Sequence, residues 1–141
     1  MIMEGYSEAT ARAFVHWYAT VDLYKILVDQ VLDPASSQHK ALLNAWGHER
    51  RLADPRDTTI VAMNVDTPYS YAWLDLRAEP VVVTLPPFER ERYMSAMIVD
   101  LETYILGYVS PRTNGNAGGD FLVAGPDWDG DVPAGITGVF R

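Results

Sequence analysis

Residues 69–76 have the sequence YSYAWLDL, in which an aromatic residue recurs at every second position. Successive side chains of a β-strand point to opposite faces. As a strand, this stretch would place on one face Tyr69, Tyr71, Trp73 and Asp75, and on the other Ser70, Ala72, Leu74 and Leu76. The alternation therefore predicts a β-strand over 69–76 that carries one aromatic face.

Further short apolar stretches lie on both sides of this one. They predict strands over 58–63, 81–85, 93–99, 104–109, 121–124 and 136–140. Gly, Pro, Asn or Asp occupy the connections, and most connections are too short for the crossover that parallel strands require. We therefore predict an antiparallel β-meander that closes toward a sandwich or a partly open barrel.

The N-terminal third has the periodicity of helices. Apolar residues recur with the spacing of one helix face at Phe14, Trp17, Tyr18, Val21, Tyr24, Leu27, Val28 and Val31. Ser7 is the predicted N-cap, and Asp33-Pro34 ends the pattern. A second helix is predicted from Ser36 or Ser37 to Trp46, with Gly47 as its C-terminal exit.

These patterns predict an α+β fold that is mostly β, with N-terminal helices in residues 1–50 and an antiparallel β region in 57–141. A length of 141 residues is that of a single domain over 1–141, or of one domain cut from a longer chain. The last predicted strand is apolar and reaches Arg141 without a cap. An exposed strand of this kind invites pairing with a partner subunit or with further chain.

Composition limits the classes of function. Eleven Lys and Arg stand against 19 Asp and Glu, so the formal charge is 11 − 19 = −8. An acidic chain is a poor match for the phosphate backbone of nucleic acids. The chain has no cysteine, which excludes disulfides, thiolate nucleophiles, iron–sulfur clusters and cysteine zinc sites. We predict no metal and no cofactor.

The location of the protein is predicted from what the sequence lacks. No stretch is apolar for long enough to span a membrane. The first residues lack the basic and apolar regions of a signal peptide. We therefore expect a cytoplasmic protein.

Short motifs follow one another in order from His48 to the turn at Gly130. They comprise N-x-D-T-x-Y-S at 64–70, W-x-D-L at 73–76, E-P-V-V at 79–82 and R-Y at 92–93, then Asp100, Y-V-x-x-R-T-x-G-x-x-x-G-D at 108–120, and G-P-x-W-x-G at 125–130. This ordered series resembles the family of domain of unknown function 1254 (DUF1254). The resemblance implies a β-rich domain that usually precedes a second domain, DUF1214, which this chain lacks. The resemblance implies no particular activity.

The loop from Asn64 to Thr67 is the first candidate for chemistry. Asp66 would act as a general base there, with Asn64 and Thr67 orienting a substrate hydroxyl or water. The alternative is a turn in which the Asn64 and Asp66 side chains bond neighbouring backbone N–H groups, as Asn and Asp commonly do.

The aromatic face of Tyr69, Tyr71 and Trp73 would line a pocket for an apolar or sugar-like ligand. The alternative is that these rings are ordinary core residues. Arg92, beside Tyr93, and Arg112 would bind a ligand carboxylate or would pair with a structural one. Asp100, at a strand end, is a further candidate for a polar contact.

Two other features are better explained by structure than by chemistry. Residues 114–119 are rich in Gly but lack the spacing of a phosphate loop, so a flexible surface turn is expected. His48 is expected to make a structural hydrogen bond, because the three histidines show no zinc-binding spacing.

Two functional hypotheses follow. In the first, the chain is a small-molecule-binding domain, or a metal-free acid–base enzyme for a neutral or weakly acidic organic substrate. Asp66 and Arg92 would be catalytic, and the substrate would contact Asn64, Thr67, Tyr69, Tyr71, Trp73, Tyr93, Asp100 and Arg112. In the second, the chain is an interaction module that completes its sheet with a partner domain or with a second copy, as a homodimer.

Overall fold

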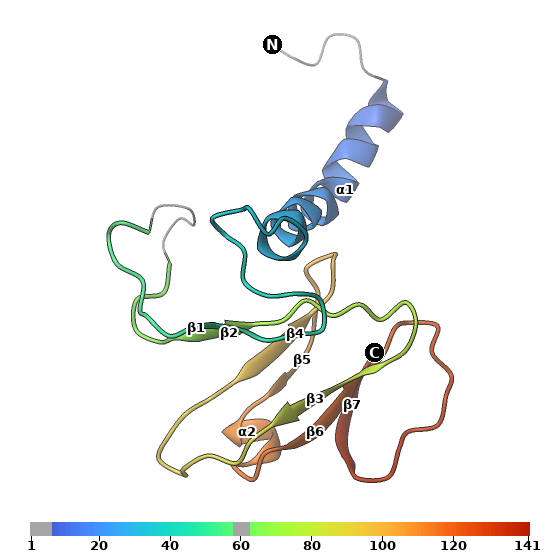
Figure 1. The fold of residues 1–141 in the computed structure, drawn as a ribbon. Helices are drawn as coiled ribbons and strands as arrows, with labels where there is room; N and C mark the ends of the chain where they lie inside the picture. The colour runs from blue at the N-terminus through green and yellow to red at the C-terminus, as the bar shows by residue number, and fades with distance from the viewer. Residues whose placement is uncertain (1–6, 58–62) are drawn as a thin grey trace. The chain divides into compact units, whose positions relative to one another are not determined.

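The structure, a computed structural model, describes residues 7–57 and 63–141 (Figure 1). Its helices are α1 (Glu8–Leu27), the π-helix η1 (Val28–Leu32) and α2 (Pro111–Asn114). Its strands are β1 (Gly47–Glu49), β2 (Tyr69–Tyr71), β3 (Val81–Leu85), β4 (Ala96–Val99), β5 (Ile105–Val109), β6 (Gly119–Val123) and β7 (Ile136–Phe140). The strand predicted over 58–63 lies outside the described residues except for Met63, which is in no strand.

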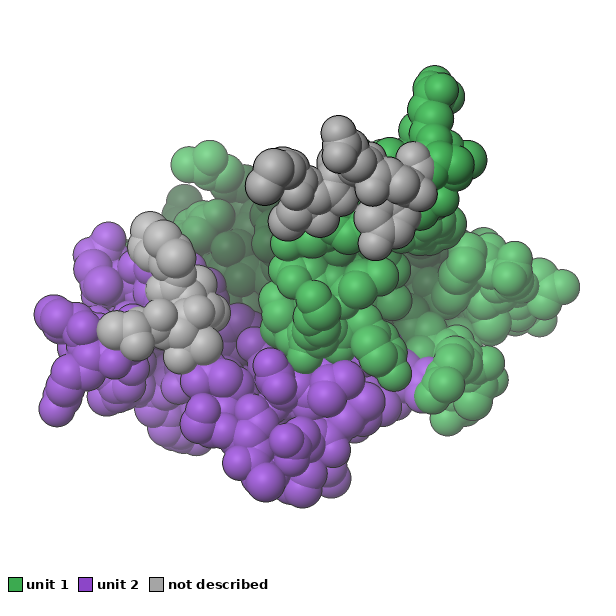
Figure 2. Space-filling view, turned by 90° about the horizontal axis from the view of Figure 1, so that it is seen from above, with its two compact units in different colours: residues 1–26, 76–141 green, residues 27–75 purple. Residues whose placement is uncertain are grey.

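The chain divides into two compact units, which Figure 2 shows in different colours. Unit 1 comprises residues 1–26 and 76–141, and unit 2 comprises residues 27–75. A division into compact units does not test the predicted single domain over 1–141, which stays a prediction.

The first predicted helix is confirmed. The Ser7 side chain accepts a hydrogen bond from the Thr10 N–H at 3.2 Å, and the Ser7 carbonyl accepts one from the Ala11 N–H at 3.1 Å. At the other end, the Asp33 N–H donates to the Val28 carbonyl at 2.8 Å, which closes the wider turn of η1. No residue of α1 is buried.

The second predicted helix, over 36–46, is wrong. Side chains here bond the backbone locally: the Asp33 carboxylate accepts the Ala35 N–H at 2.9 Å, and the Ser36 hydroxyl accepts the Gln38 N–H at 3.1 Å. Such bonds offer the backbone an alternative to the helix ladder. Asn44 adopts φ 58°, which a right-handed helix excludes.

In unit 2, β1 pairs antiparallel with β2, with Gly47 opposite Tyr71 and Glu49 opposite Tyr69. The predicted strand over 69–76 therefore exists only for its first three residues. Beyond Tyr71, Asn44 replaces a strand partner, because its N–H donates to the Trp73 carbonyl at 2.9 Å and its side-chain oxygen accepts the Asp75 N–H at 2.7 Å.

In unit 1, β3, β6 and β7 form one sheet and β4 and β5 form another (Figure 1). The pairs β3–β6 and β4–β5 are antiparallel, as predicted, and each strand predicted between 81 and 140 is present with small shifts of its ends. The pair β6–β7 is parallel, which corrects the purely antiparallel meander. The connection between Val123 and Ile136 has twelve residues, enough for the crossover that a parallel pair requires.

The core of unit 1 lies between its two sheets. Phe121 on β6 is 1% exposed and clusters with Leu85 of β3 and Val109 of β5. Partly buried side chains from both sheets complete the cluster: Val83, Met94, Ala96, Ile98 and Phe140. The two sheets thus share one hydrophobic core, and the predicted α+β fold that is mostly β is confirmed.

The Gly-rich segment after α2 is held against β3. A Cβ atom on Gly118 would lie 2.4 Å from the Leu85 carbonyl oxygen and 2.6 Å from the Pro86 carbonyl carbon. The backbone at Gly118 therefore packs directly on another backbone, within a segment that contains no buried residue and so lies at the surface, as expected.

Within residues 7–57 and 63–141, no helix has both the length and the apolar character needed to cross a membrane.

Candidate functional site

Unit 2 contains a pocket of about 230 Å³. Its described lining belongs entirely to that unit, in the segments from η1 to β2: Gln30, Ser37, Gln38, Lys40, Glu49, Arg51, Ala53, Asp57, Met63, Asn64, Thr67, Tyr69 and Tyr71. Four of the residues that the sequence singled out, Asn64, Thr67, Tyr69 and Tyr71, are thereby brought together.

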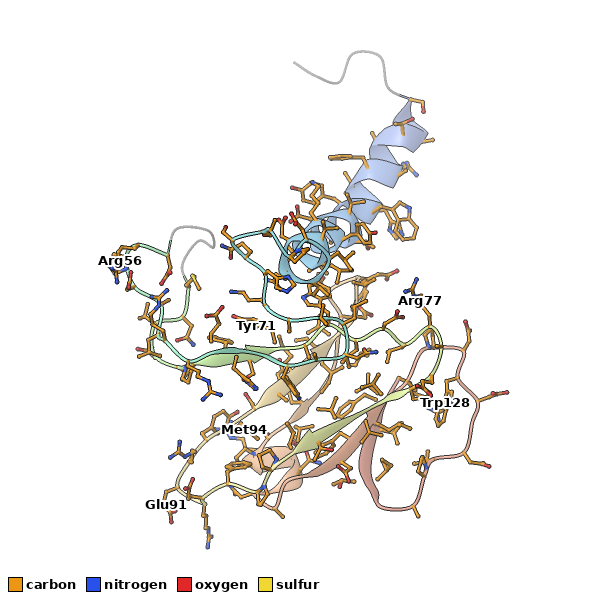
Figure 3. All side chains as sticks on the ribbon, in the orientation of Figure 1. Arg56, Tyr71, Arg77, Glu91, Met94 and Trp128 are labelled. Carbon is orange, nitrogen blue, oxygen red and sulfur yellow. The ribbon has the colours of Figure 1, made fainter. Side chains whose placement is uncertain are left out.

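Two tyrosines form the aromatic wall of the pocket. Tyr69 and Tyr71 are two positions apart on β2, so their side chains share a face, as predicted. Their rings stack with centroids 5.7 Å apart and an interplanar angle of 14°. Tyr71 is labelled in Figure 3. The Lys40 ammonium lies 6.0 Å from the centroid of its ring. Burial raises the pKa of the Tyr71 phenol, and Tyr69 and Glu49 add to that effect, so the phenol stays neutral at physiological pH.

The charged side chains of the pocket are paired with one another. Lys40 bonds the Glu49 carboxylate, and Arg51 bonds both oxygens of Asp57 at 2.8 and 2.7 Å. The Arg51 hydrogen bond, supported by one from the Asp54 N–H, lowers the pKa of Asp57 to about 2. Among the described residues, two positive and two negative side chains line the pocket, so this part of its wall carries no net charge near neutral pH.

The loop after Met63 is organised by the Asn64 side chain. The Asn64 Oδ1 accepts the N–H groups of Asp66 and Thr67 at 2.7 and 3.3 Å. The Asn64 Nδ2 donates to Thr67 Oγ1 at 3.2 Å and to the Tyr69 hydroxyl at 3.0 Å. The loop is thus an Asn-centred turn, the alternative given for this motif, and it also connects to the aromatic wall.

Asp66 is exposed and does not line the pocket, although it lies between two residues that do. Within the described part of the chain its carboxylate accepts no hydrogen bond. Trp73, also in unit 2, donates its indole N–H to Gln30 Oε1 at 2.9 Å and lies outside the pocket lining.

The remaining predicted residues belong to unit 1 and have local partners or exposed positions. Arg92 pairs with Glu89 at 3.0 Å, and Tyr93 is exposed. The Asp100 carboxylate accepts the N–H groups of Glu102 and Tyr104, both at 2.9 Å, and so shapes the β4–β5 hairpin.

Arg112 is exposed on α2, and it too lies outside the pocket lining. The carboxylate–arginine pair of Asp66 and Arg92 is therefore split between the two units.

His48 makes the structural hydrogen bond that the sequence predicted. Its Nδ1 lies 2.8 Å from the Ser70 hydroxyl, across the β1–β2 pair. Its ring stacks on Trp46 with centroids 6.4 Å apart. Among residues 7–57 and 63–141, no three His, Asp or Glu side chains gather as a metal site.

Sequence reasoning missed Lys40, Glu49, Arg51 and Gln30 as pocket residues. Gln30 lies in η1 and Lys40 in the segment for which the sequence predicts a second helix, and their contacts depend on chain reversals that no sequence motif marks. Only Glu49 could have been found from the sequence. If residues 47–49 are recognised as a strand that pairs with β2, Glu49 falls opposite Tyr69.

Comparisons with known proteins place the chain among proteins of unknown function. The family described as "Protein of unknown function (DUF1254)" matches residues 43–141. The crystal structure of the VPA0106 protein from Vibrio parahaemolyticus is similar, with 29% sequence identity and a TM-score of 0.69 over 92% of this chain. The chain spans 28% of the length of that protein. No curated protein matches the chain.

Proposed function

The chain belongs to the DUF1254 family of proteins of unknown function, and we propose that its unit 2 binds a small neutral organic molecule in the pocket. The observation that carries this proposal is the Tyr69–Tyr71 stack in a pocket whose four charged side chains are paired with one another. Aromatic walls with a few polar groups are typical of small-molecule sites. The proposed ligand therefore combines a ring face with polar substituents.

The charge of the pocket supports a neutral ligand. A charged ligand would compete with the Lys40–Glu49 or the Arg51–Asp57 pair, in which the Lys40 and Asp57 side chains are only 22 and 24% exposed. The volume of about 230 Å³ compares with the cavity of about 150 Å³ that holds benzene. A single six-membered ring with a short substituent fits this volume.

The enzymatic form of the proposal is metal-free acid–base chemistry at the same pocket. Asp66 would be the base, because its exposed carboxylate follows Asn64 in the loop that lines the pocket. Arg92 was predicted as a second catalytic residue, and that role stays a prediction. Arg92 belongs to unit 1, where its described partner is Glu89. We place no cofactor in the reaction.

Removal of the Tyr71 ring tests the binding proposal. We expect Tyr71→Ala to weaken the binding of neutral one-ring fragments about tenfold, because the variant loses the stacking surface. Binding is measured by protein-observed NMR titration, with amide shifts expected at Asn64, Thr67 and Tyr69. Tyr104→Ala is the matched control, since Tyr104 is 67% exposed in unit 1 and should leave affinity unchanged.

Tyr71→Leu separates folding from binding, because leucine keeps apolar bulk against Lys40 but offers no ring to stack. An unchanged β1–β2 amide pattern with reduced affinity supports the proposal. If no neutral one-ring fragment shifts the pocket amides of the original chain at millimolar concentration, the proposed function is wrong.

The alternative function is an interaction module that pairs with a second copy of itself. The specific observation is α1, whose aromatic residues Phe14, Trp17, Tyr18 and Tyr24 are 66, 50, 54 and 56% exposed. At roughly 150–250 Å² per aromatic side chain, these four expose about 450 Å² in each copy. Two copies together approach the ~1,000 Å² of a specific interface. The outer edge of β7, last in its sheet, is a second surface for pairing.

A charge placed on α1 tests this alternative. We expect Trp17→Glu to convert a dimer into a monomer at micromolar concentration, because burial of an unpaired carboxylate opposes association. The mass is measured by light scattering during size-exclusion chromatography. Val15→Glu is the control, because Val15 lies two positions earlier on the opposite side of the helix and is 76% exposed. A monomeric original chain would contradict the interaction module.

A further inference from the structure

The Asn64 carboxamide has only one possible orientation. Two backbone N–H groups, of Asp66 and Thr67, point at one of its terminal atoms. A backbone N–H can only donate, so that atom must be the carbonyl oxygen, and the other must be the NH₂ group. Asn64 therefore acts as a donor toward the two hydroxyl groups that it contacts.

This orientation fixes the polarity of both hydroxyls. The oxygens of Thr67 and Tyr69 accept the hydrogen bonds from Asn64, so the single proton of each hydroxyl points elsewhere. No acceptor in residues 7–57 or 63–141 takes either proton. Both residues line the pocket, which thus presents two hydroxyl donors beside the Tyr69–Tyr71 stack.

Gln30 adds a third donor by the same reasoning. The Trp73 indole N–H can only donate, and it bonds Gln30 Oε1 at 2.9 Å, so the NH₂ group of Gln30 remains for other partners. The carboxylates of the pocket already have partners, because Lys40 bonds Glu49 Oε1 and Arg51 bonds both oxygens of Asp57.

We infer that the ligand of this pocket is a neutral carbonyl compound with one ring: an aryl or cyclic ketone, ester or carboxamide. Its oxygen accepts hydrogen bonds from Thr67 and Tyr69, and its ring lies against the Tyr69–Tyr71 stack. This inference rests on the proposed binding function and adds the chemical class of the ligand. A ligand that only donates hydrogen bonds leaves both hydroxyl protons without an acceptor.

Two matched probes test the inference. Acetophenone has one ring and one acceptor, whereas N-methylaniline has one ring, similar size and an N–H donor. We expect the original chain to bind acetophenone about tenfold more tightly than N-methylaniline. The ketone oxygen can accept hydrogen bonds from the hydroxyls of Thr67 and Tyr69, whereas the N–H group of the amine cannot. Affinities come from NMR titration of the pocket amides.

The substitution Asn64→Asp inverts the polarity without removing the turn. One oxygen of the new carboxylate can still accept the two backbone N–H groups, and the other now accepts from the hydroxyls of Thr67 and Tyr69. The two hydroxyl protons then bond the carboxylate at position 64, and the lone pairs of the two hydroxyl oxygens face the ligand. We expect acetophenone to lose its advantage and N-methylaniline to bind at least as tightly as acetophenone.

Asn114→Asp is the control for added charge, because Asn114 is exposed at the end of α2 in unit 1 and its side-chain oxygen already accepts the Thr113 hydroxyl. That variant should keep the tenfold preference. An unchanged amide spectrum for β1 and β2 shows that Asn64→Asp is folded. If it is not folded, Thr67→Val, which removes one donor and keeps the shape, should reduce the acetophenone preference.

The outcomes separate this inference from the proposed function. Equal binding of the two probes, or a preference that Asn64→Asp does not change, overturns the carbonyl class and leaves the pocket intact. Binding of other neutral one-ring fragments but of neither probe overturns it as well. If no neutral fragment shifts the pocket amides, the proposed function fails and this inference fails with it.

Discussion

Phe121→Ala is expected to lower the free energy of unfolding of unit 1 by about 3–5 kcal/mol. Phe121 is 1% exposed and is the largest fully buried side chain. Its ring packs 6.4 Å from the ring of Phe140 on β7, and its edge lies 3.2 Å from where a Cβ of Gly138 would be. Because the backbone of the neighbouring strand lies against the ring at Gly138, the cavity left by truncation cannot collapse fully.

Urea unfolding followed by circular dichroism measures the loss, and amide signals of β3 and β6 assign it to unit 1. The matched control is Tyr93→Ala, because Tyr93 is 65% exposed and its truncation should cost less than about 1 kcal/mol. A loss below about 1 kcal/mol for Phe121→Ala would show that the two sheets do not share the core described above.

The second large effect is expected at Gly118, with Gly118→Ala costing about 3 kcal/mol. Gly118 has φ +71°, a conformation that costs an L-residue about 1–2 kcal/mol. The new methyl group would also lie 2.4 Å from the Leu85 carbonyl oxygen, which is backbone and cannot rotate away. Overpacking of this kind adds about 1–3 kcal/mol.

Gly115→Ala isolates the steric part of that effect. Gly115 has nearly the same φ, +73°, but nothing lies within 4 Å of its added Cβ. Both variants therefore place an L-residue at positive φ, and only Gly118→Ala adds a contact with backbone. Thermal and urea unfolding should rank Gly118→Ala below Gly115→Ala by about 1–3 kcal/mol. Equal stabilities would mean that the Gly-rich segment is not packed on β3.

Features that depend on local sequence were predictable. The helix from Ser7 to Asp33 and the strands β3 and β7 follow from periodicity and from capping residues that act within a few positions. The prediction of a second helix was wrong because the side chains of Asp33 and Ser36 accept backbone N–H groups that a helix would bond to its own carbonyls. The strand at 69–76 was too long because Asn44, far away in sequence, takes over its hydrogen bonds.

The residues of the candidate site likewise divide into those that local sequence predicts and those that it does not. Asn64, Thr67, Tyr69 and Tyr71 meet in one pocket because a single turn and the period of one strand place them there. Lys40 and Glu49 join them through chain reversals that have no local signature. Arg92 was grouped with Asp66 by chemical type alone, and chemical type carries no information about which unit a residue belongs to.

The order of the two units along the chain has a consequence for biosynthesis. Unit 2 is one continuous segment, whereas unit 1 is assembled from two segments that flank it. The residues that the structure describes as lining the pocket all lie between Gln30 and Tyr71, before the first strand of unit 1 at Val81. Chains emerge from the ribosome N-terminus first. The described lining of the pocket therefore includes no residue translated after Tyr71, whereas β6 pairs with β7, a strand that is translated later.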